Sequence, residues 1–118
     1  MKITKILVCL ALLLTLAGCG AAKNEKEFTF KVKFEDSTSK TYKIKTDDKT
    51  VGEALQDKKL IEGTKSSYGL FVTEVAKQKA ENNDYWAFYI DGKMAPTGVD
   101  ATKVVAHKTY SFVYTKAD

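Results

Sequence analysis

The sequence predicts an α+β domain of β-grasp-like order: an N-terminal β-hairpin, one short helix, and then several mostly antiparallel strands. Three observations lead to this expectation. Apolar and polar side chains alternate along residues 28–34 and 41–46, as they do in half-buried strands. Residues 50–59 have the capping and spacing of a short amphipathic helix. Residues 85–93 place four aromatic side chains before an Asp-Gly pair that is typical of a two-residue hairpin turn.

The first eighteen residues have the layout of a secretory signal. Lys2 and Lys5 precede an apolar run at 6–16, which is too short for a stable membrane-spanning helix. The boundary, Leu-Ala-Gly-Cys at 16–19, matches a lipobox and resembles that of bacterial diacylglycerol-modified lipoproteins. The resemblance implies that Cys19 carries covalent diacylglycerol and becomes the new N-terminus. We therefore expect a lipid anchor on the extracytoplasmic face of the bacterial cell membrane.

Three segments follow from this boundary. Residues 1–18 are expected to be the signal peptide, residues 19–27 a lipidated flexible tether, and residues 28–118 a single domain. The processed chain has 118 − 18 = 100 residues, enough for one small core. Cys9 would be removed and Cys19 lipidated, so no thiol would remain for a disulfide or a nucleophile.

The charge pattern argues against nucleic-acid binding. All 19 basic residues are Lys, and without Lys2 and Lys5 they number 17 against 15 acidic residues, a net charge of +2. Arg, the usual residue for bidentate phosphate capture, does not occur. Lysines spread among acidic residues are typical of a solvated surface, and no nucleic-acid partner is expected.

The first half of the domain is expected to form a hairpin and a helix. Strands at 28–34 and 41–46 would pair across a turn cluster at 35–39. Their inward side chains would be Phe28, Phe30, Val32, Phe34, Tyr42 and Ile44. Thr50 and Glu53 form a capping box that begins the helix, and Gly63 ends this region. Residues 64–67 are expected to be a loop.

The second half is expected to contain four further strands. A strand at 68–75 would be followed at 76–83 by an edge insertion or a disordered loop. Residues 85–90 are predicted to be the central strand, with a turn at Asp91-Gly92 and a short return strand. A connector at 99–108, anchored by Val104 and Val105, would lead to the last strand at 109–115.

Several segments in this order resemble the transcobalamin-like C-terminal domain family, a bacterial family of unknown function that is frequent on surface lipoproteins. They are Thr-Val-Gly-Glu-Ala-Leu at 50–55, Gly-Leu-Phe-Val at 69–72, Tyr-Trp at 85–86, Tyr-Ile-Asp-Gly-Lys at 89–93, Gly-Val at 98–99 and Tyr-Ser-Phe-Val-Tyr at 110–114. The resemblance covers about residues 28–115. The family is also similar to soluble-ligand-binding β-grasp domains. The resemblance implies that this chain captures a small, cobalamin-like molecule, with an uptake transporter as a partner.

The candidate ligand contacts lie on and after the aromatic strand. They are Tyr85, Trp86, Tyr89, Asp91, Gly92, Met94 and Gly98. Trp86 could stack on a flat ligand or anchor the core, and alternation with Phe88 and Ile90 favours the core. Tyr85 and Tyr89 share the opposite face, where they would contact a ligand or belong to a second packing layer. For the remaining four residues the alternative is a structural role. Asp91 and Gly92 would form a turn, Met94 would pack beside it, and Gly98 would mark a bend.

Neither catalysis nor metal binding is expected. The sequence shows no Ser-His-Asp set, nucleophile elbow or phosphate-binding glycine loop. His107 is the only histidine and stands without clustered ligands, so no metal and no cofactor beyond the lipid are predicted. Two functions remain: a binding module for a small molecule, or a surface module that docks a protein or cell-wall partner by strand addition.

Overall fold

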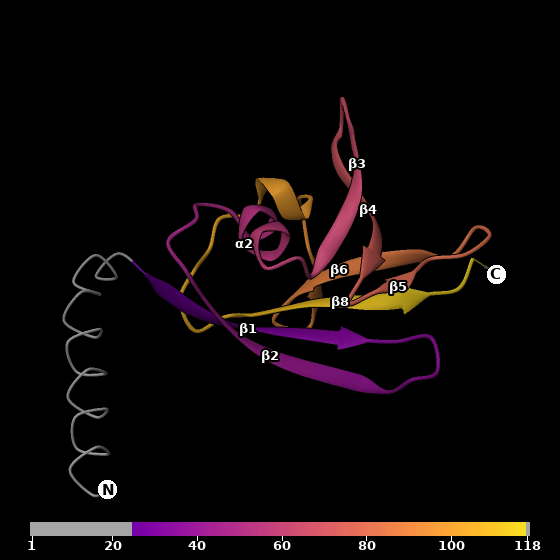
Figure 1. Cartoon of the computed structure of the whole chain (residues 1–118), viewed down its shortest axis with the longest axis horizontal. Coiled ribbons are helices and arrows are strands. Elements are labelled where there is room, and N and C mark those ends of the chain that lie inside the picture. The colour runs from indigo at the N-terminus through magenta and orange to yellow at the C-terminus, as the bar shows by residue number, and fades with distance from the viewer. Residues whose placement is uncertain (1–24, 118) are drawn as a thin grey trace, which may run out of the picture.

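A computed structural model describes residues 25–117 (Figure 1). The predicted signal peptide and the predicted lipid attachment at Cys19 lie outside this range. The described chain forms two β-sheets, one short α-helix and a 3-10 turn, and this arrangement is compatible with the predicted α+β class. Within residues 25–117, no helix is both long enough and apolar enough to cross a membrane.

The larger sheet has the strand order β2-β1-β8-β6-β7. Strands β1 (Lys26–Lys33) and β2 (Ser39–Thr46) form the predicted antiparallel hairpin. Strand β8 (Thr109–Thr115) lies parallel to β1 and antiparallel to β6 (Tyr85–Ile90). β8 is therefore the central strand, and the prediction that residues 85–90 occupy the centre was wrong. On its other side β6 pairs only with the two-residue strand β7 (Lys93–Met94), a difference that aromatic composition does not reveal.

The core lies between this sheet and the elements that cover it. β1 and β8 bury Phe28, Phe30, Val32, Tyr110 and Phe112, each at most 2% exposed. The rings pack edge to face, with 5.1 Å between the centroids of Phe28 and Tyr110. These are the inward faces that alternation predicted.

Helix α2 (Val51–Asp57) covers part of the core, and its capping box is present as predicted. The Glu53 amide donates to the Thr50 hydroxyl at 3.1 Å, and the Thr50 amide donates to the Glu53 carboxylate at 3.3 Å. The helix buries Val51 and Leu55 and packs beside the 3-10 turn η2 (Val99–Ala101). In the following connector Val104 is buried, whereas Val105 is 47% exposed and does not serve as the predicted anchor.

A second sheet contains β3 (Ile61–Ser66), β4 (Gly69–Val75) and β5 (Gln78–Lys79). The prediction of a loop at 64–67 was therefore wrong for residues 64–66, which belong to β3. In residues 76–83 only Gln78 and Lys79 form a strand, at the edge of this sheet, which agrees with the predicted edge insertion and not with its alternative, a disordered loop. β3 buries only Ile61, so its sequence carries no alternation. The turn before β5 consists of Ala76 and Lys77, both with positive φ, and lacks the Gly, Asn or Asp that usually indicates such a turn.

A β-bulge determines which side chains of β4 face the core. Val72 pairs with Gly63 and Glu74 pairs with Glu62, so Thr73 is an extra residue. The bulge shifts the alternation and allows Leu70, Val72 and Val75 all to be buried, while Phe71 faces outward. A Cβ atom on Gly63 would lie 2.2 Å from the Phe71 carbonyl oxygen, so this close approach requires glycine.

Candidate functional site

Three large aromatic side chains remain exposed around the second sheet. Tyr68 in the β3–β4 turn is 98% exposed, Phe71 on β4 is 59% exposed, and Tyr85 at the start of β6 is 42% exposed. The β3–β4 hairpin projects away from the rest of the domain, which leaves its turn open to solvent (Figure 1). We refer to Tyr68, Phe71 and Tyr85 as the outer aromatic surface.

Two grooves follow this surface, and Phe71 lines both of them. The first groove, of about 450 Å³, is lined by Thr64, Ser66, Tyr68, Gly69, Leu70 and Phe71. The second groove, of about 380 Å³, is lined by Phe71, Val72, Thr73, Ala80, Asn82, Asn83, Asp84 and Tyr85. Each has a volume within the range of small-molecule sites, and each combines apolar surface with a few polar groups.

The hairpin that carries the first groove is fixed within its turn and immediately after it. The Tyr68 amide donates to the Ser66 hydroxyl at 3.1 Å, and that hydroxyl donates to the Gly69 carbonyl at 3.1 Å. Gly69 has φ +110°, a conformation that favours glycine. The Leu70 amide donates to the Asp100 carboxylate at 3.1 Å, which ties the hairpin to η2.

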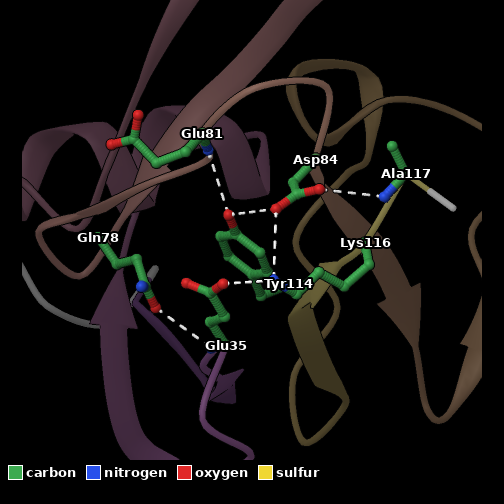
Figure 2. Close-up of polar contacts among 7 residues, drawn as sticks. All are labelled: Glu35, Gln78, Glu81, Asp84, Tyr114, Lys116 and Ala117. Atoms are coloured by element: carbon green, nitrogen blue, oxygen red, sulfur yellow. Dashed lines mark hydrogen bonds and ion pairs between the residues drawn. The ribbon is translucent and has the colours of Figure 1, made fainter.

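The polar wall of the second groove is held by Asp84 and Tyr114 (Figure 2). The Tyr114 hydroxyl donates to Asp84 Oδ2 at 2.7 Å and accepts from the Glu81 amide at 3.1 Å. The Ala117 amide donates to Asp84 Oδ1 at 3.0 Å. The segment 81–84 is therefore attached at both ends to the C-terminal end of β8.

Charged groups extend this network toward the β1–β2 turn. Lys116 Nζ lies 2.5 Å from Glu35 Oε2 and 3.9 Å from Asp84 Oδ2. The Glu35 amide donates to the Gln78 side-chain oxygen at 3.2 Å, as Figure 2 shows. The hydrogen bonds from Tyr114 and Ala117, together with the Lys116 charge, hold the pKa of Asp84 below its ordinary value of 3.8. The Glu35 carboxylate raises the pKa of Lys116.

Trp86, a predicted contact, lies in the core with 6% exposure. Its indole nitrogen donates to the Gln78 carbonyl at 3.1 Å, and its ring packs edge to face against Tyr114 with 5.2 Å between centroids. Trp86 therefore anchors the core, which is the alternative that the alternation along the strand favoured. Tyr89, further along β6, is half-buried.

The other predicted contacts lie beyond the far end of β6. Asp91 and Gly92 form the hairpin turn with positive φ, and Asp91 accepts from the Thr109 amide at 2.9 Å. Met94 on β7 is 70% exposed, and the Gly98 carbonyl accepts from the Thr102 hydroxyl at 2.8 Å. A six-residue strand spans about 16–20 Å, so the structure does not bring this turn together with Tyr85.

Of the predicted contacts, Tyr85 lines a groove, and sequence reasoning missed Tyr68 and Phe71. The signal available for Phe71 was its position between Leu70 and Val72, which share the opposite face of β4. The signal for Tyr68 was its place in a turn immediately before Gly69. Within residues 25–117, His, Cys, Asp and Glu side chains do not gather in any group of three that could hold a metal ion.

The described residues define a small two-sheet α+β domain with an exposed aromatic hairpin beside its larger sheet. The chain belongs to the family described as Domain of unknown function (DUF4430), whose model matches residues 48–116. No curated protein matches the sequence.

Solved structures with a similar fold include the following two. One is a "putative metal binding protein" from Ruminococcus gnavus ATCC 29149, with 27% identity, a TM-score of 0.76, and coverage of 79% of this chain and 99% of that one. The other is haptocorrin in complex with Cbi, with 16% identity and a TM-score of 0.63. That match covers 78% of this chain but 25% of haptocorrin, so this chain corresponds to about a quarter of it. The expected likeness to transcobalamin-like proteins is thus present at the level of the fold.

Proposed function

We propose that the chain is a membrane-anchored extracytoplasmic binding module that captures a cobalamin-like small molecule on the outer aromatic surface. One observation carries the proposal: Tyr68, Phe71 and Tyr85 are exposed beside two grooves that share Phe71. Clustered exposed aromatic side chains usually mark a binding surface, because leaving them in water forgoes the free energy of burial.

The surroundings suit a preformed site. Asp100 holds β4 next to the hairpin turn, and the Asp84–Tyr114 pair fixes the polar wall of the second groove. Ligand binding would therefore order few protein groups, which lowers its entropic cost.

A comparison with a solved structure supports the proposed ligand class. Haptocorrin, whose fold is similar, was crystallised in complex with Cbi. The position of β8, parallel to β1 and between two hairpins, also supports our assignment of the β-grasp order. Nothing in this arrangement suggests catalysis, and we propose a non-enzymatic role.

The membrane anchor is the second part of the proposal. The lipobox at 16–19 would place diacylglycerol on Cys19, and the tether at 19–27 spans at most about 32 Å. The grooves would then lie close to the bilayer, within reach of an uptake transporter. A Cys19→Ser variant should move the protein from the membrane fraction to the soluble fraction, whereas retention in the membrane would contradict the anchor.

Binding can be tested with the full chain, as the cell processes it, in lipid nanodiscs. We expect a corrinoid to bind in calorimetric titration, and Phe71→Ala to weaken binding by about tenfold or more. Met94→Ala is the matched control, since Met94 is an exposed apolar residue outside both grooves. No corrinoid binding, or equal weakening by the two variants, would contradict the proposed ligand or its site.

A second candidate function is a surface module that docks a protein or cell-wall partner. The observation in its favour is Tyr68, which is almost fully exposed in a projecting turn. Crosslinking in intact cells from position 68 would trap one reproducible polypeptide if this alternative holds. If position 68 captures no neighbour while corrinoids bind, the small-molecule function is supported.

A further inference from the structure

We propose that the two grooves select a neutral amphipathic ligand, one with a flat apolar body and a hydroxyl- or amide-bearing edge, and disfavour anions. The inference rests on the proposed function and specifies the chemical class of its ligand. It depends on the charges, the polar groups and the rings that line the two grooves.

The lining is nearly free of charge in a highly charged chain. Charged residues make up 29% of the sequence, yet the first groove has none and the second has only Asp84. Three other grooves each carry at least two charged side chains: Glu35 and Asp36 in one, Glu27 and Lys43 in another, and a mixed set around Lys45, Asp48 and Lys58 in the third. A carboxylate or phosphate would therefore meet no counter-charge among the side chains that line the aromatic grooves.

Both carboxylate oxygens of Asp84 accept hydrogen bonds from other groups of the protein. Its side chain is 12% exposed, one oxygen accepts from Tyr114 and the other accepts from Ala117. Lys116, the nearby cation, lies closer to Glu35. The carboxylate is thus committed to holding the groove wall, and its negative charge disfavours an anionic ligand nearby.

Neutral polar groups are presented on that wall instead. The Asp84 amide donates to the Glu81 carbonyl at 2.9 Å, which closes a turn with Asn82 and Asn83 at its centre. Asn82 has φ +56°, a conformation that Asn tolerates better than most residues, and both Asn residues are exposed. Each side-chain amide can donate to and accept from a hydroxyl or amide, while Phe71 and Tyr85 offer ring surface to an apolar body.

A matched pair of probes tests the charge preference: 4-nitrophenyl β-glucoside and 4-nitrophenyl β-glucuronide, which share the aryl ring and differ by one carboxylate. Ligand-observed NMR titrations would use the processed full chain in nanodiscs at low salt, and a corrinoid would be titrated in parallel. We expect the glucoside to bind about tenfold more tightly than the glucuronide, and Phe71→Ala to weaken its binding.

Two variants of the exposed Asn83 sharpen the test. Asn83→Lys should narrow or reverse the preference by supplying a counter-charge, whereas Asn83→Ala should leave the glucuronide disfavoured. Equal or tighter binding of the glucuronide by the unmodified chain would overturn the inference, as would no binding of the glucoside. The parallel corrinoid titration decides the proposed function separately. If a corrinoid binds, the proposed function stands whichever glycoside binds more tightly. If no corrinoid binds, the result counts against the proposed function.

Discussion

The domain contains two sets of aromatic side chains with opposite fates. The inner set of Phe28, Phe30, Tyr110 and Phe112 is at most 2% exposed, whereas the outer aromatic surface is 42% to 98% exposed. Residue type does not separate them. Tyr85 and Trp86 are neighbours on one strand, yet Tyr85 lines a groove and Trp86 is 6% exposed.

Position in the two sheets explains the difference. β8 has a full-length neighbour on each side, and its inward residues face the helix-covered core. β4 belongs to a three-stranded sheet, and it packs its Leu70 and Val72 face inward while Phe71 faces solvent. An aromatic residue is therefore a core residue or a surface residue according to what covers its face of the strand, and the outer set is where binding can be sought.

The largest loss of stability should follow from truncating a ring of the inner set. Phe112→Ala should lower the free energy of unfolding by about 3–5 kcal/mol, because it removes a buried ring and leaves a cavity. Phe71→Ala should change it by only about 0.5 kcal/mol. Urea denaturation of both variants measures this contrast, and comparable destabilisation would mean that Phe71 is a packing residue.

A smaller effect is expected where the hairpin backbones approach closely. Gly63→Ala would place a Cβ atom 2.2 Å from the Phe71 carbonyl oxygen, so β3 and β4 must shift apart at a cost of about 1–3 kcal/mol. Ligand binding should weaken as well, since Phe71 lines both grooves. Glu62→Ala, at an exposed neighbouring position, is the control for thermal unfolding and titration. An unaffected Gly63→Ala variant would contradict the bulge geometry.

The helix cap should separate stability from binding. Thr50→Ala removes the hydroxyl that accepts from the Glu53 amide, which should cost about 1 kcal/mol. Because Thr50 does not line either aromatic groove, the ligand affinity should be unchanged at temperatures where the variant is folded. Weaker binding by the folded variant would show that the helix contributes to the site.

The smallest expected effect is a change in how stability depends on pH. Hydrogen bonds from Tyr114 and Ala117 lower the pKa of Asp84 in the folded state, so its stabilisation is present above 3.8 and is lost as pH falls through the lower folded value. Asp84→Asn should therefore make the melting temperature less sensitive to pH below about 4. Tyr114→Phe should also make the melting temperature less sensitive to pH. In the variant that carries both substitutions, the reduction should be smaller than the sum of the two single reductions. Full additivity would contradict the coupling shown in Figure 2.

The sequence predicted the elements whose signals are local. The alternation of β1, β2 and β8 identified their inward faces, and the Thr50–Glu53 capping box located the start of the helix. The Asp91-Gly92 turn also followed from residue type, since both residues have positive φ.

The remaining errors concern information that local sequence does not carry. β3 is held by backbone pairing with β4 and buries one side chain, and Ala76 and Lys77 form a turn without turn-favouring residues. The bulge at Thr73 lets Val75 join Leu70 and Val72 on the buried face, and only the pairing of β3 with β4 reveals this bulge. The candidate site was therefore predicted at Tyr85, while the hairpin that completes the two grooves could not be.

The central claim, that the outer aromatic surface holds a small molecule, is tested most directly by native mass spectrometry. Wild-type and Phe71→Ala chains would be recovered from the parent organism's own envelope. We predict a reproducible, dissociable small-molecule mass on the wild-type chain and its loss from the variant. Two bare chains, or the same added mass on both, would contradict the claim.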